Sequence, residues 1–237
     1  MNESLKKLIR KIIPLPVRRA VSKARARLFP RAPGSYHSSN SNPDHQNLDV
    51  YWSEDMAKVL EEWGVDNAWN EIQLLMAACK GKVLDIACGT GKTIDILKGF
   101  TQVEIHGCDI SDLLLQKAMD RGIPKERLKL CDATRTDYPD NYFDFSYSIG
   151  SLEHFTEEGI ELFIKESLRI TGTASFHMVP VSRNNIENGW ITTVQSYFNN
   201  SEAWWYEKFR KDYRKVIAVP SKWEDYLSFG RWYLCFK

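Results

Sequence analysis

The sequence predicts an α/β fold: a doubly wound sheet of seven strands, mostly parallel, whose last strand is antiparallel. From Leu48 onward, short apolar segments alternate with helical patterns, which is typical of a parallel sheet covered on both faces. The last two apolar segments are joined without a clear helix, so we expect an antiparallel hairpin at the sheet edge. A third observation is an apolar segment that breaks into glycines directly before a helical pattern. The 237 residues suffice for one such domain with an appendage.

The individual elements follow from hydrophobic periodicity and from capping residues. We expect strands at 82–87, 103–109, 127–131, 143–149, 173–179, 214–219 and 231–236. We expect helices at 54–63, 68–78, 91–99, 111–121, 157–170 and 201–212. Ser53 is a good N-cap for the first of these helices. The stretch from Val181 to Asn200 has no clear period and is expected to be a long, irregular loop.

The N-terminal part of the chain differs from the rest in charge and composition. Residues 1–31 contain ten basic residues and one acidic residue, and they show weakly amphipathic helical patterns. Residues 32–47 are rich in Pro, Ser and Asn and form a predicted linker, so the domain itself is expected at 48–237. Residues 1–31 lack the continuous apolar core of a secretory signal. Three interpretations stay open: contact with an anionic membrane surface or a membrane-bound partner, a tail or packed helix, or an organellar transit peptide.

The remaining bulk features concern location and partners. Outside residues 1–31 the chain has 22 basic and 30 acidic residues, and this negative charge argues against nucleic acid as the main substrate. Its five cysteines form no Cys-x-x-Cys pair, which favours buried thiols in a reducing cytoplasm. No apolar run approaches the roughly 18 residues of a membrane-spanning helix. We therefore expect a cytoplasmic protein, with residues 1–31 offering a peripheral contact at the inner face of the membrane.

The segment from Lys82 to Lys92 is the strongest single motif. An apolar strand ends in small residues and a helix start, an arrangement that lets backbone N–H groups approach a ligand. A P-loop would need glycine where Ile86 stands. The dinucleotide fingerprint Gly-x-Gly-x-x-Gly would need glycine at Ile94 or at Lys92, depending on the register. Both of these sites are therefore disfavoured.

Four motifs together resemble the class I S-adenosylmethionine-dependent methyltransferases, in their small-molecule branch. They are the run from Val83 to Gly91, the aspartate that ends the second strand, Cys131-Asp132-Ala133, and Phe143-Asp144 leading to Leu152-Glu153-His154-Phe155. Ala87 takes the place of the first glycine of the family's acidic-x-Gly-x-Gly-x-Gly motif. The resemblance implies a Rossmann-like fold over 48–237 and S-adenosylmethionine as cofactor.

The resemblance also implies which residues hold that cofactor. Asp109, with Ile110 beside it, would accept hydrogen bonds from the ribose hydroxyls, although Asp109 could equally cap the following helix. Asp132 and Ala133 would meet the adenine, with a turn aspartate as the alternative for Asp132. The remaining implied contacts, at the methionine end, are Asp85, Ala87, Gly89, Gly91, Ser148 and Ile149. All of these lie at the carboxyl ends of strands, where open α/β sheets bind ligands.

Methyl transfer requires alignment of a nucleophile, exclusion of water and, for a hydroxyl acceptor, removal of a proton. His154 is the candidate base because imidazole titrates near neutrality and the residue follows the fourth strand; a structural contact in that loop is the alternative. His177 is a candidate substrate contact, with a core histidine as the alternative. Tyr51 and Trp52 could form a lid or belong to the core. No metal-ligand cluster is visible, and no metal is required.

The acceptor is the least determined part. Arg183, Trp190, Gln195 and their amide neighbours in the loop 181–200, together with the basic N-terminus, favour O-methylation of a sugar or glycan precursor in surface polysaccharide synthesis; a solvated loop is the alternative. The chain also resembles, more loosely, methyltransferases found among polysaccharide-assembly enzymes. A diffusible small molecule, such as a quinone, an amine or a secondary metabolite, is the second candidate. A non-catalytic, cofactor-binding module docked to a membrane partner is the third.

Overall fold

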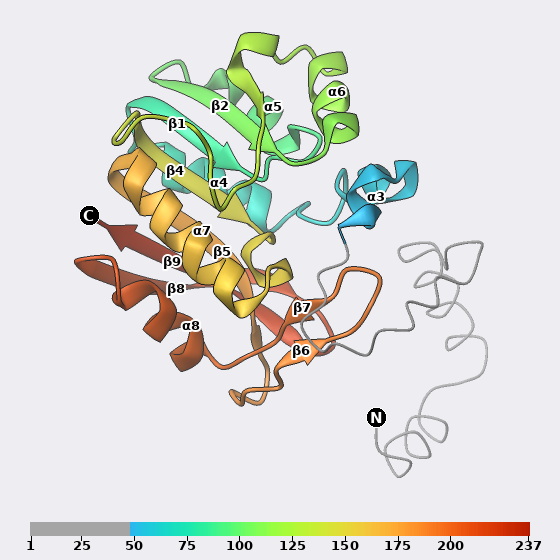
Figure 1. Ribbon diagram of the computed structural model, residues 1–237, viewed down its shortest axis with the longest axis vertical. Helices are drawn as coiled ribbons and strands as arrows, with labels where there is room; N and C mark the ends of the chain where they lie inside the picture. The colour runs from blue at the N-terminus through green and yellow to red at the C-terminus, as the bar shows by residue number, and fades with distance from the viewer. Residues whose placement is uncertain (1–47) are drawn as a thin grey trace. The chain divides into compact units, whose positions relative to one another are not determined.

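The computed structural model describes residues 48–237, and the N-terminal extension and linker predicted for residues 1–47 lie outside this range. Its seven-stranded sheet has the order β3-β2-β1-β4-β5-β9-β8 (Figure 1). The first five strands are parallel, whereas β9 is antiparallel to both of its neighbours. The strands are β1 (Gly81–Ile86), β2 (Val103–Asp109), β3 (Leu128–Leu130), β4 (Phe143–Ile149), β5 (Thr171–Ser182), β8 (Lys215–Glu224) and β9 (Ser228–Phe236). The predicted doubly wound fold with an antiparallel last strand is confirmed.

Helices cover both faces of this sheet and bury two separate cores. One core contains α7 and α8, with Phe163 and Trp205 among its fully buried side chains. The other contains α4, α5 and α6, with Ile72 and Leu97 among its buried residues. The helices are α3 (Glu54–Val59), α4 (Ala68–Met76), α5 (Lys92–Ile96), α6 (Asp112–Asp120), α7 (Glu157–Ile170) and α8 (Glu202–Arg210). The cores bury the apolar stripes of α4 to α8 and fix the sheet between them.

Strands β5 and β8 are longer than predicted, and three further elements differ from the prediction. Helix α3 stops at Val59, and the chain then turns until Asn67, whose side chain accepts from the backbone N–H of Ala68 and caps α4. Helix α5 is a short piece followed by a 3-10 turn at Leu97–Gly99. The loop expected at 181–200 contains a small hairpin of β6 (Trp190–Ile191) and β7 (Tyr197–Phe198). Its two-residue strands are too short to produce an alternating pattern, so periodicity could not reveal them.

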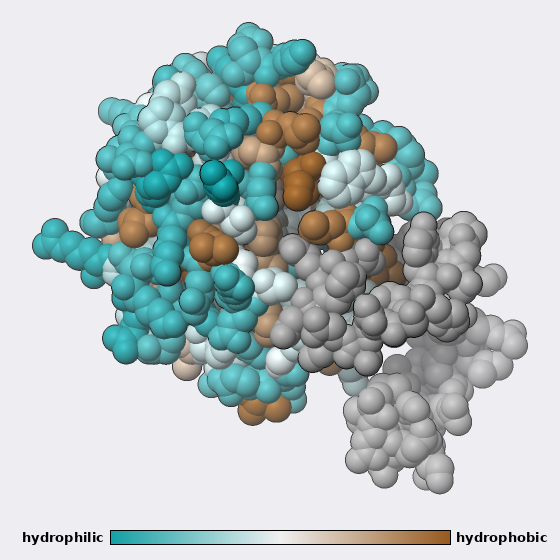
Figure 2. Space-filling view, in the orientation of Figure 1, coloured by the Kyte–Doolittle hydropathy of each residue, from teal (hydrophilic) through white to brown (hydrophobic). Residues whose placement is uncertain are grey.

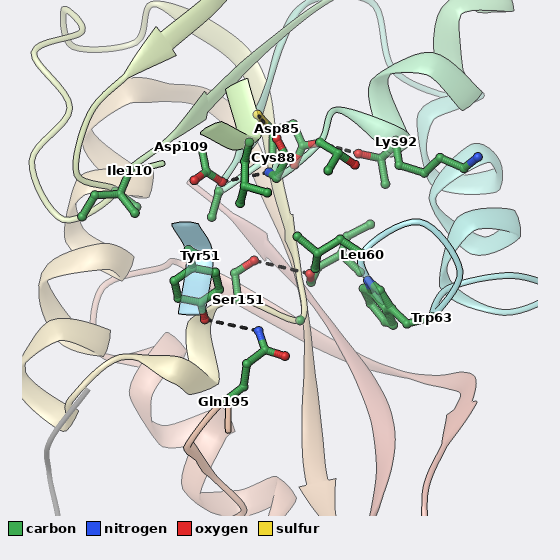
Figure 3. A pocket seen from close by; sticks show the side chains of 18 of the residues that line it. Tyr51, Leu60, Trp63, Asp85, Cys88, Lys92, Asp109, Ile110, Ser151 and Gln195 are labelled. Carbon is green, nitrogen blue, oxygen red and sulfur yellow. Dashed lines mark hydrogen bonds between the residues drawn. The ribbon is translucent and has the colours of Figure 1, made fainter. Parts of the chain in front are cut away.

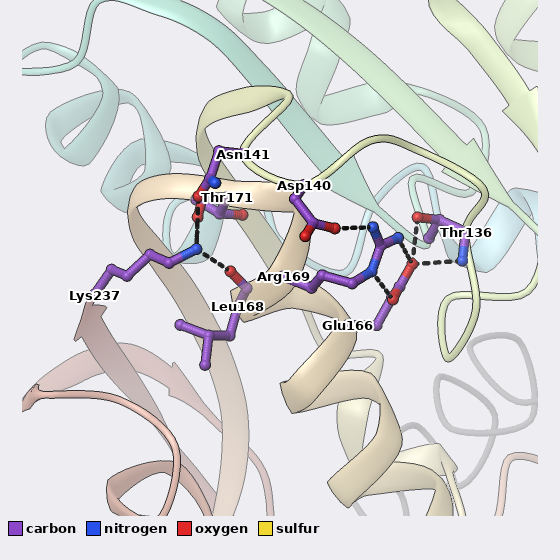
Figure 4. Close-up of polar contacts among 8 residues, drawn as sticks. All are labelled: Thr136, Asp140, Asn141, Glu166, Leu168, Arg169, Thr171 and Lys237. Atoms are coloured by element: carbon purple, nitrogen blue, oxygen red, sulfur yellow. Dashed lines mark hydrogen bonds and ion pairs between the residues drawn. The ribbon is translucent and has the colours of Figure 1, made fainter.

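A polar network fastens the loop between β3 and β4 to helix α7 (Figure 4). The Glu166 carboxylate accepts from the backbone N–H of Thr136 at 2.7 Å and from its hydroxyl at 2.6 Å. Arg169 donates to Glu166 at 2.7 and 2.8 Å and to Asp140 at 2.6 Å. The Lys237 ammonium donates to the carbonyl oxygen of Leu168 at 3.0 Å. The contacts to Thr136 hold the segment that directly follows Asp132 and Ala133.

The two edges of the sheet are short or interrupted. Strand β3 has only three residues, and its Leu130 is 58% exposed. Strand β8 contains Pro220, and its register with β9 shifts between Pro220 and Glu224. The face shown in Figure 2 is mainly hydrophilic, with a group of hydrophobic residues near α5 and α6. In the part of the chain that the structure describes, no helix has the length and apolarity needed to cross a membrane.

Candidate functional site

A cavity opens at the carboxyl ends of β1, β2 and β4 (Figure 3). It encloses about 1030 Å³ of empty space, its open mouth included. Asp85, Cys88 and Asp109 lie at one end of it, and Tyr51, Ser151 and Gln195 lie at the other. Of the residues predicted to bind a cofactor, the following line it: Asp85, Ala87, Gly89, Asp109, Ile110, Asp132, Ala133 and Ile149. The fold therefore brings together residues that are up to 64 positions apart in the sequence.

The glycine turn between β1 and α5 depends on backbone conformations that side chains disfavour. Ala87, Gly89 and Gly91 have φ angles of 59°, 54° and 71°. For Ala87 this left-handed conformation costs roughly 1 kcal/mol relative to glycine. Gly91 does not line the cavity; a Cβ there would lie 2.3 Å from Cδ1 of Ile123, so its small size lets the turn pack beneath α6.

Asp109 ties the glycine turn to the end of β2. Its carboxylate accepts from the backbone N–H of Gly89 at 2.8 Å and from that of Ser111 at 2.9 Å. Burial raises the pKa of Asp109, and the backbone N–H donors partly counteract this. Helix α6 is capped by Ser111, whose hydroxyl accepts from the backbone N–H of Leu114. A buried carboxylate at the cavity wall can accept further hydrogen bonds, because each oxygen has two lone pairs.

Asp85 lies deeper, below the turn. It accepts a short hydrogen bond from the hydroxyl of Thr93, which in turn accepts from the Tyr147 hydroxyl at 3.3 Å. Burial raises the pKa of Asp85 to about 7, although the Thr93 and Tyr147 hydroxyls counteract part of this rise. This carboxyl is therefore poised between its neutral and charged forms near neutral pH.

Asp132 and Ala133 lie where β3 ends. Ala133 is buried, whereas Asp132 is exposed. One Asp132 oxygen accepts from the backbone N–H of Thr134 at 2.8 Å and from its hydroxyl at 2.7 Å. Asp132 thus stabilises a turn, which was the alternative considered for it in the sequence analysis. Its second carboxylate oxygen has no hydrogen bond within residues 48–237.

The opposite end of the cavity joins Tyr51 and Gln195, which lie in segments that the sequence had marked, with residues that sequence analysis missed. Tyr51, a predicted lid residue, lines it, and its hydroxyl accepts from the Gln195 carboxamide at 3.4 Å. Leu60 and Trp63 come from the turn after α3, and Ser151 comes from the end of β4. Each is a common residue in an irregular segment, so no motif marked it beforehand.

A cover segment, residues 54–67, is fastened to the glycine turn by charged side chains. The Glu61 carboxylate accepts from the Thr90 hydroxyl at 2.6 Å and forms a short hydrogen bond with Arg121. Arg121 also donates to the Thr90 carbonyl at 3.1 Å, and the Lys92 ammonium lies 3.8 Å from Glu61. These contacts hold Leu60 and Trp63 over the cavity.

Two predicted contacts, Ser148 and His177, lie in the core and do not line the cavity. Both are fully buried, and the Ser148 hydroxyl lies 2.9 Å from Nδ1 of His177. The imidazole stacks on Phe209, with ring centroids 5.2 Å apart. Burial lowers the pKa of His177 to about 3, so the ring is neutral near pH 7. Ser148 and His177 lie opposite each other on the neighbouring strands β4 and β5, and both side chains point into the core beneath α8. His177 is therefore a core histidine, which was the alternative to a substrate contact.

Trp52, Arg183 and His154 also lie away from the cavity wall. The indole N–H of Trp52 donates to Asp112 at 2.8 Å. Arg183 pairs with Glu224 at 2.6 Å in a peripheral loop. Nδ1 of His154 lies 2.9 Å from the Ser196 carbonyl, and burial lowers its pKa to about 4. The imidazole is therefore neutral near pH 7 and stands behind Tyr51, with ring centroids 6.5 Å apart.

Glu153, beside His154, is a buried carboxyl. In the sequence analysis it was part of the motif after the fourth strand, with no predicted role in binding or catalysis. It is 5% exposed, and its Oε2 has no hydrogen-bond partner within the described part of the chain. Its Oε1 lies 3.8 Å from Nε2 of His154. Burial raises the pKa of Glu153 to about 8, so the group is mainly protonated at neutral pH.

The sequence around the cavity matches a known protein family. Residues 83–173, which include the glycine turn, Asp109 and Asp132, match the family described as a methyltransferase domain. The chain contains a class I methyltransferase domain. Methyltransferase domains of this class use S-adenosylmethionine as cofactor. The predicted family and cofactor are thus confirmed.

Named relatives of this methyltransferase domain match over part of their length. The ubiquinone/menaquinone biosynthesis C-methyltransferase UbiE of Burkholderia mallei is 34% identical over 122 residues, which are 47% of this chain and 44% of the relative. The same protein of Burkholderia thailandensis matches equally well. This chain therefore spans less than half the length of these relatives.

Solved structures share the fold of the methyltransferase domain. A putative methyltransferase of Haloferax volcanii, in complex with the Trm112 activator, has a TM-score of 0.64 and 14% identity, covering 81% of this chain and 98% of that one. A methyltransferase of Thermotoga maritima, described as a possible histamine N-methyltransferase, has a TM-score of 0.56 and 16% identity, covering 80% and 97%. At these identities the likeness concerns the fold alone.

Proposed function

We propose that this protein transfers a methyl group from S-adenosylmethionine to a small-molecule acceptor. One observation carries the proposal: the glycine turn and the carboxylates of Asp109 and Asp132 face a single cavity at the carboxyl ends of parallel strands. Ligands of open α/β sheets bind at this edge. The matched methyltransferase family supports the same activity.

The residues present fit this cofactor. Asp109 would accept from the ribose hydroxyls, because its buried carboxylate reaches the cavity wall and keeps lone pairs beyond its contacts to backbone N–H groups. Asp132 and Ala133 would meet the adenine, and the turn at Gly89 would leave room for the methionine end. When bound, S-adenosylmethionine supplies an electrophilic methyl group on a sulfonium. The protein's own task is to align the acceptor and exclude water, for which the cover segment and Tyr51 are suitably placed.

A diffusible small molecule is the acceptor that we favour. The match to a C-methyltransferase of quinone biosynthesis supports it. The glycan acceptor suggested by the sequence rested on the polar and aromatic loop 181–200 and on the basic N-terminus. Of that loop, Gln195 lines the cavity, whereas Arg183 is paired with Glu224 at a distance from it. Methylation of a sugar or glycan precursor therefore stays a weaker second proposal. His154 as general base also stays a proposal. Its imidazole lies behind Tyr51 and does not line the cavity.

The proposed cellular setting is the cytoplasm, with residues 1–31 contacting an anionic membrane surface or a membrane-bound partner. Ten basic residues in this segment support the idea, because each contributes about 1 kcal/mol near an anionic bilayer. The rest of the chain is acidic overall, so such a contact would be confined to the extension.

Calorimetry with S-adenosylmethionine tests the proposed function. We expect the wild-type protein to bind it, and Asp109→Ala to bind about 10- to 100-fold more weakly, since hydrogen bonds to a charged group contribute about 1.5–3 kcal/mol. Asp120→Ala, at an exposed site on α6, is the matched control and should bind as the wild type does.

Because Asp109 also holds Gly89 and Ser111, Asp109→Asn is measured alongside, and unfolding curves verify that both variants are folded. Undiminished binding by both folded variants would refute the ribose assignment. Absence of binding by the wild type would refute the proposed function as a whole.

A further inference from the structure

The hairpin of β6 and β7 places its connecting loop at the cavity. The Trp190 and Phe198 rings meet edge to face, with centroids 5.0 Å apart, and Phe198 is buried against Trp204. The Ser196 carbonyl lies 2.9 Å from Nδ1 of His154, so the loop is also fixed from the end of β4. Gln195, in this loop, therefore reaches the cavity from an anchored base.

The contact between Gln195 and Tyr51 sets the direction of the carboxamide. Its nitrogen donates to the Tyr51 hydroxyl, so its oxygen points away from Tyr51, toward the side where Trp63 lies (Figure 3). No donor to this oxygen is found among residues 48–237. The Tyr51 hydroxyl accepts from Gln195 and keeps its own proton free to donate. This end of the cavity thus offers one hydrogen-bond acceptor and one donor side by side.

The surrounding wall is uncharged and mostly apolar; Ser151 adds a hydroxyl, which donates to the Ile149 carbonyl at 3.4 Å. Leu60, Trp63 and Phe155 supply aliphatic and aromatic surface at this end. The charged residues of the lining are near the glycine turn and the ends of β1 to β3, namely Asp85, Lys92, Asp109 and Asp132. Lys92 is also engaged, 3.8 Å from Glu61 and over the Trp69 ring. An ionised ligand group here would lose its hydration without gaining a partner, and a polyol would leave most of its hydroxyls unsatisfied.

We propose that Gln195 is a specificity-determining residue that selects an uncharged, ring-shaped acceptor bearing a hydroxyl or amino group. That group donates to Gln195 Oε1, and its ring packs between Tyr51, Leu60 and Trp63. The inference rests on the proposed methyltransferase function and narrows its acceptor class. In this arrangement the β6–β7 loop recognises the acceptor, and the glycine turn binds the cofactor.

The test measures binding to the full-length protein saturated with S-adenosylhomocysteine, so that no turnover occurs. Four probes are titrated and followed by ligand-observed NMR: phenol, anisole, benzoate and methyl α-D-glucopyranoside. Phenol should bind most tightly, and it should exceed anisole about three- to tenfold, the effect of one net hydrogen bond of roughly 0.5–1.5 kcal/mol.

Three variants separate recognition from folding. Gln195→Leu should lose the preference for phenol over anisole, whereas Gln195→Glu, which keeps an oxygen acceptor, should retain it. Gln102→Leu, at an exposed glutamine, should behave as the wild type does. All variants should bind S-adenosylhomocysteine equally, and failure of the wild type to bind it would count against the proposed function itself.

With S-adenosylhomocysteine bound, three results would overturn the inference alone. They are an unchanged phenol preference in Gln195→Leu, tighter wild-type binding of benzoate or the glucoside than of phenol, and no binding of any probe by the wild type.

Discussion

Glu153 is a carboxyl group that folding moves from water into an apolar setting behind the cavity. One of its oxygens has no partner within residues 48–237, and burial raises its pKa to about 8. In the unfolded chain a glutamate titrates near pH 4.5. Between these two values the folded state holds a proton that the unfolded state releases, so this group's contribution to stability decreases as pH rises.

Glu153→Gln should remove this pH dependence, because glutamine resembles the neutral acid in shape. Relative to the wild type, the variant's free energy of unfolding should increase between pH 5 and pH 8 by up to about 1.4 kcal/mol per pH unit. Urea unfolding at several pH values measures the slope. Glu62→Gln, at an exposed position, is the control, and an equal slope in both variants would contradict the buried-carboxyl explanation.

At the residue scale, the sequence predicted the lining of one end of the cavity, around the glycine turn, better than that of the other end. Asp109 and Gly89 belong to motifs whose spacing along the chain is fixed by strand and turn geometry. Gln195 and Trp63 belong to irregular segments, and only the folded arrangement brings them together. Ser148 was misplaced because neighbouring residues of a strand point to opposite faces, and the motif did not show which one faces the cavity.

The cover segment is an element whose position depends on a few charged contacts. Glu61, Thr90 and Arg121 join it to the glycine turn, and Leu60 would lie 3.2 Å from a Cβ placed on Gly89. We therefore expect that loosening these contacts would widen the mouth of the cavity. Their strength should determine how fast the cofactor exchanges.

Arg121→Ala should speed the dissociation of S-adenosylmethionine about tenfold, since hydrogen bonds to charged groups are worth about 1.5–3 kcal/mol. Stopped-flow tryptophan fluorescence measures the rate, and hydrogen exchange should show faster exchange in residues 54–67. Arg127→Ala, at an exposed arginine, should leave both quantities unchanged. An unaltered dissociation rate in Arg121→Ala would rule out this role of the contacts.

At the element scale, segments with a strong pattern and clear end signals were predicted closely, whereas β5 and β8 were predicted too short. Helix α7 and strands β2 and β4 match their predicted bounds, because each has a strong pattern and clear end signals. Helix α3 was predicted too long, since the apolar pattern continues through Leu60 and Trp63, which face the cavity. The same side chains that extended the helical pattern thus belong to the site.

At the scale of the whole molecule, the two parts of the chain carry net charges of opposite sign: residues 1–31 are basic, and the rest of the chain is acidic. Deleting residues 1–31 should abolish co-sedimentation with phosphatidylglycerol vesicles while leaving S-adenosylmethionine binding unchanged. Phosphatidylcholine vesicles, which carry no net charge, should bind neither form. Equal partitioning of both forms onto the anionic vesicles would exclude the extension as a membrane-contact segment.

The interrupted edges of the sheet have a consequence for solubility. An open edge strand exposes unpaired backbone groups that can recruit a strand from another molecule and start aggregation. Here β3 offers only three residues, and in β8 Pro220 lacks an N–H group. The Lys222 N–H is taken up by the Glu71 carboxylate of α4 at 2.6 Å. We therefore expect replacement of Pro220 or Glu71 to favour β-sheet aggregates without changing the lining of the cavity.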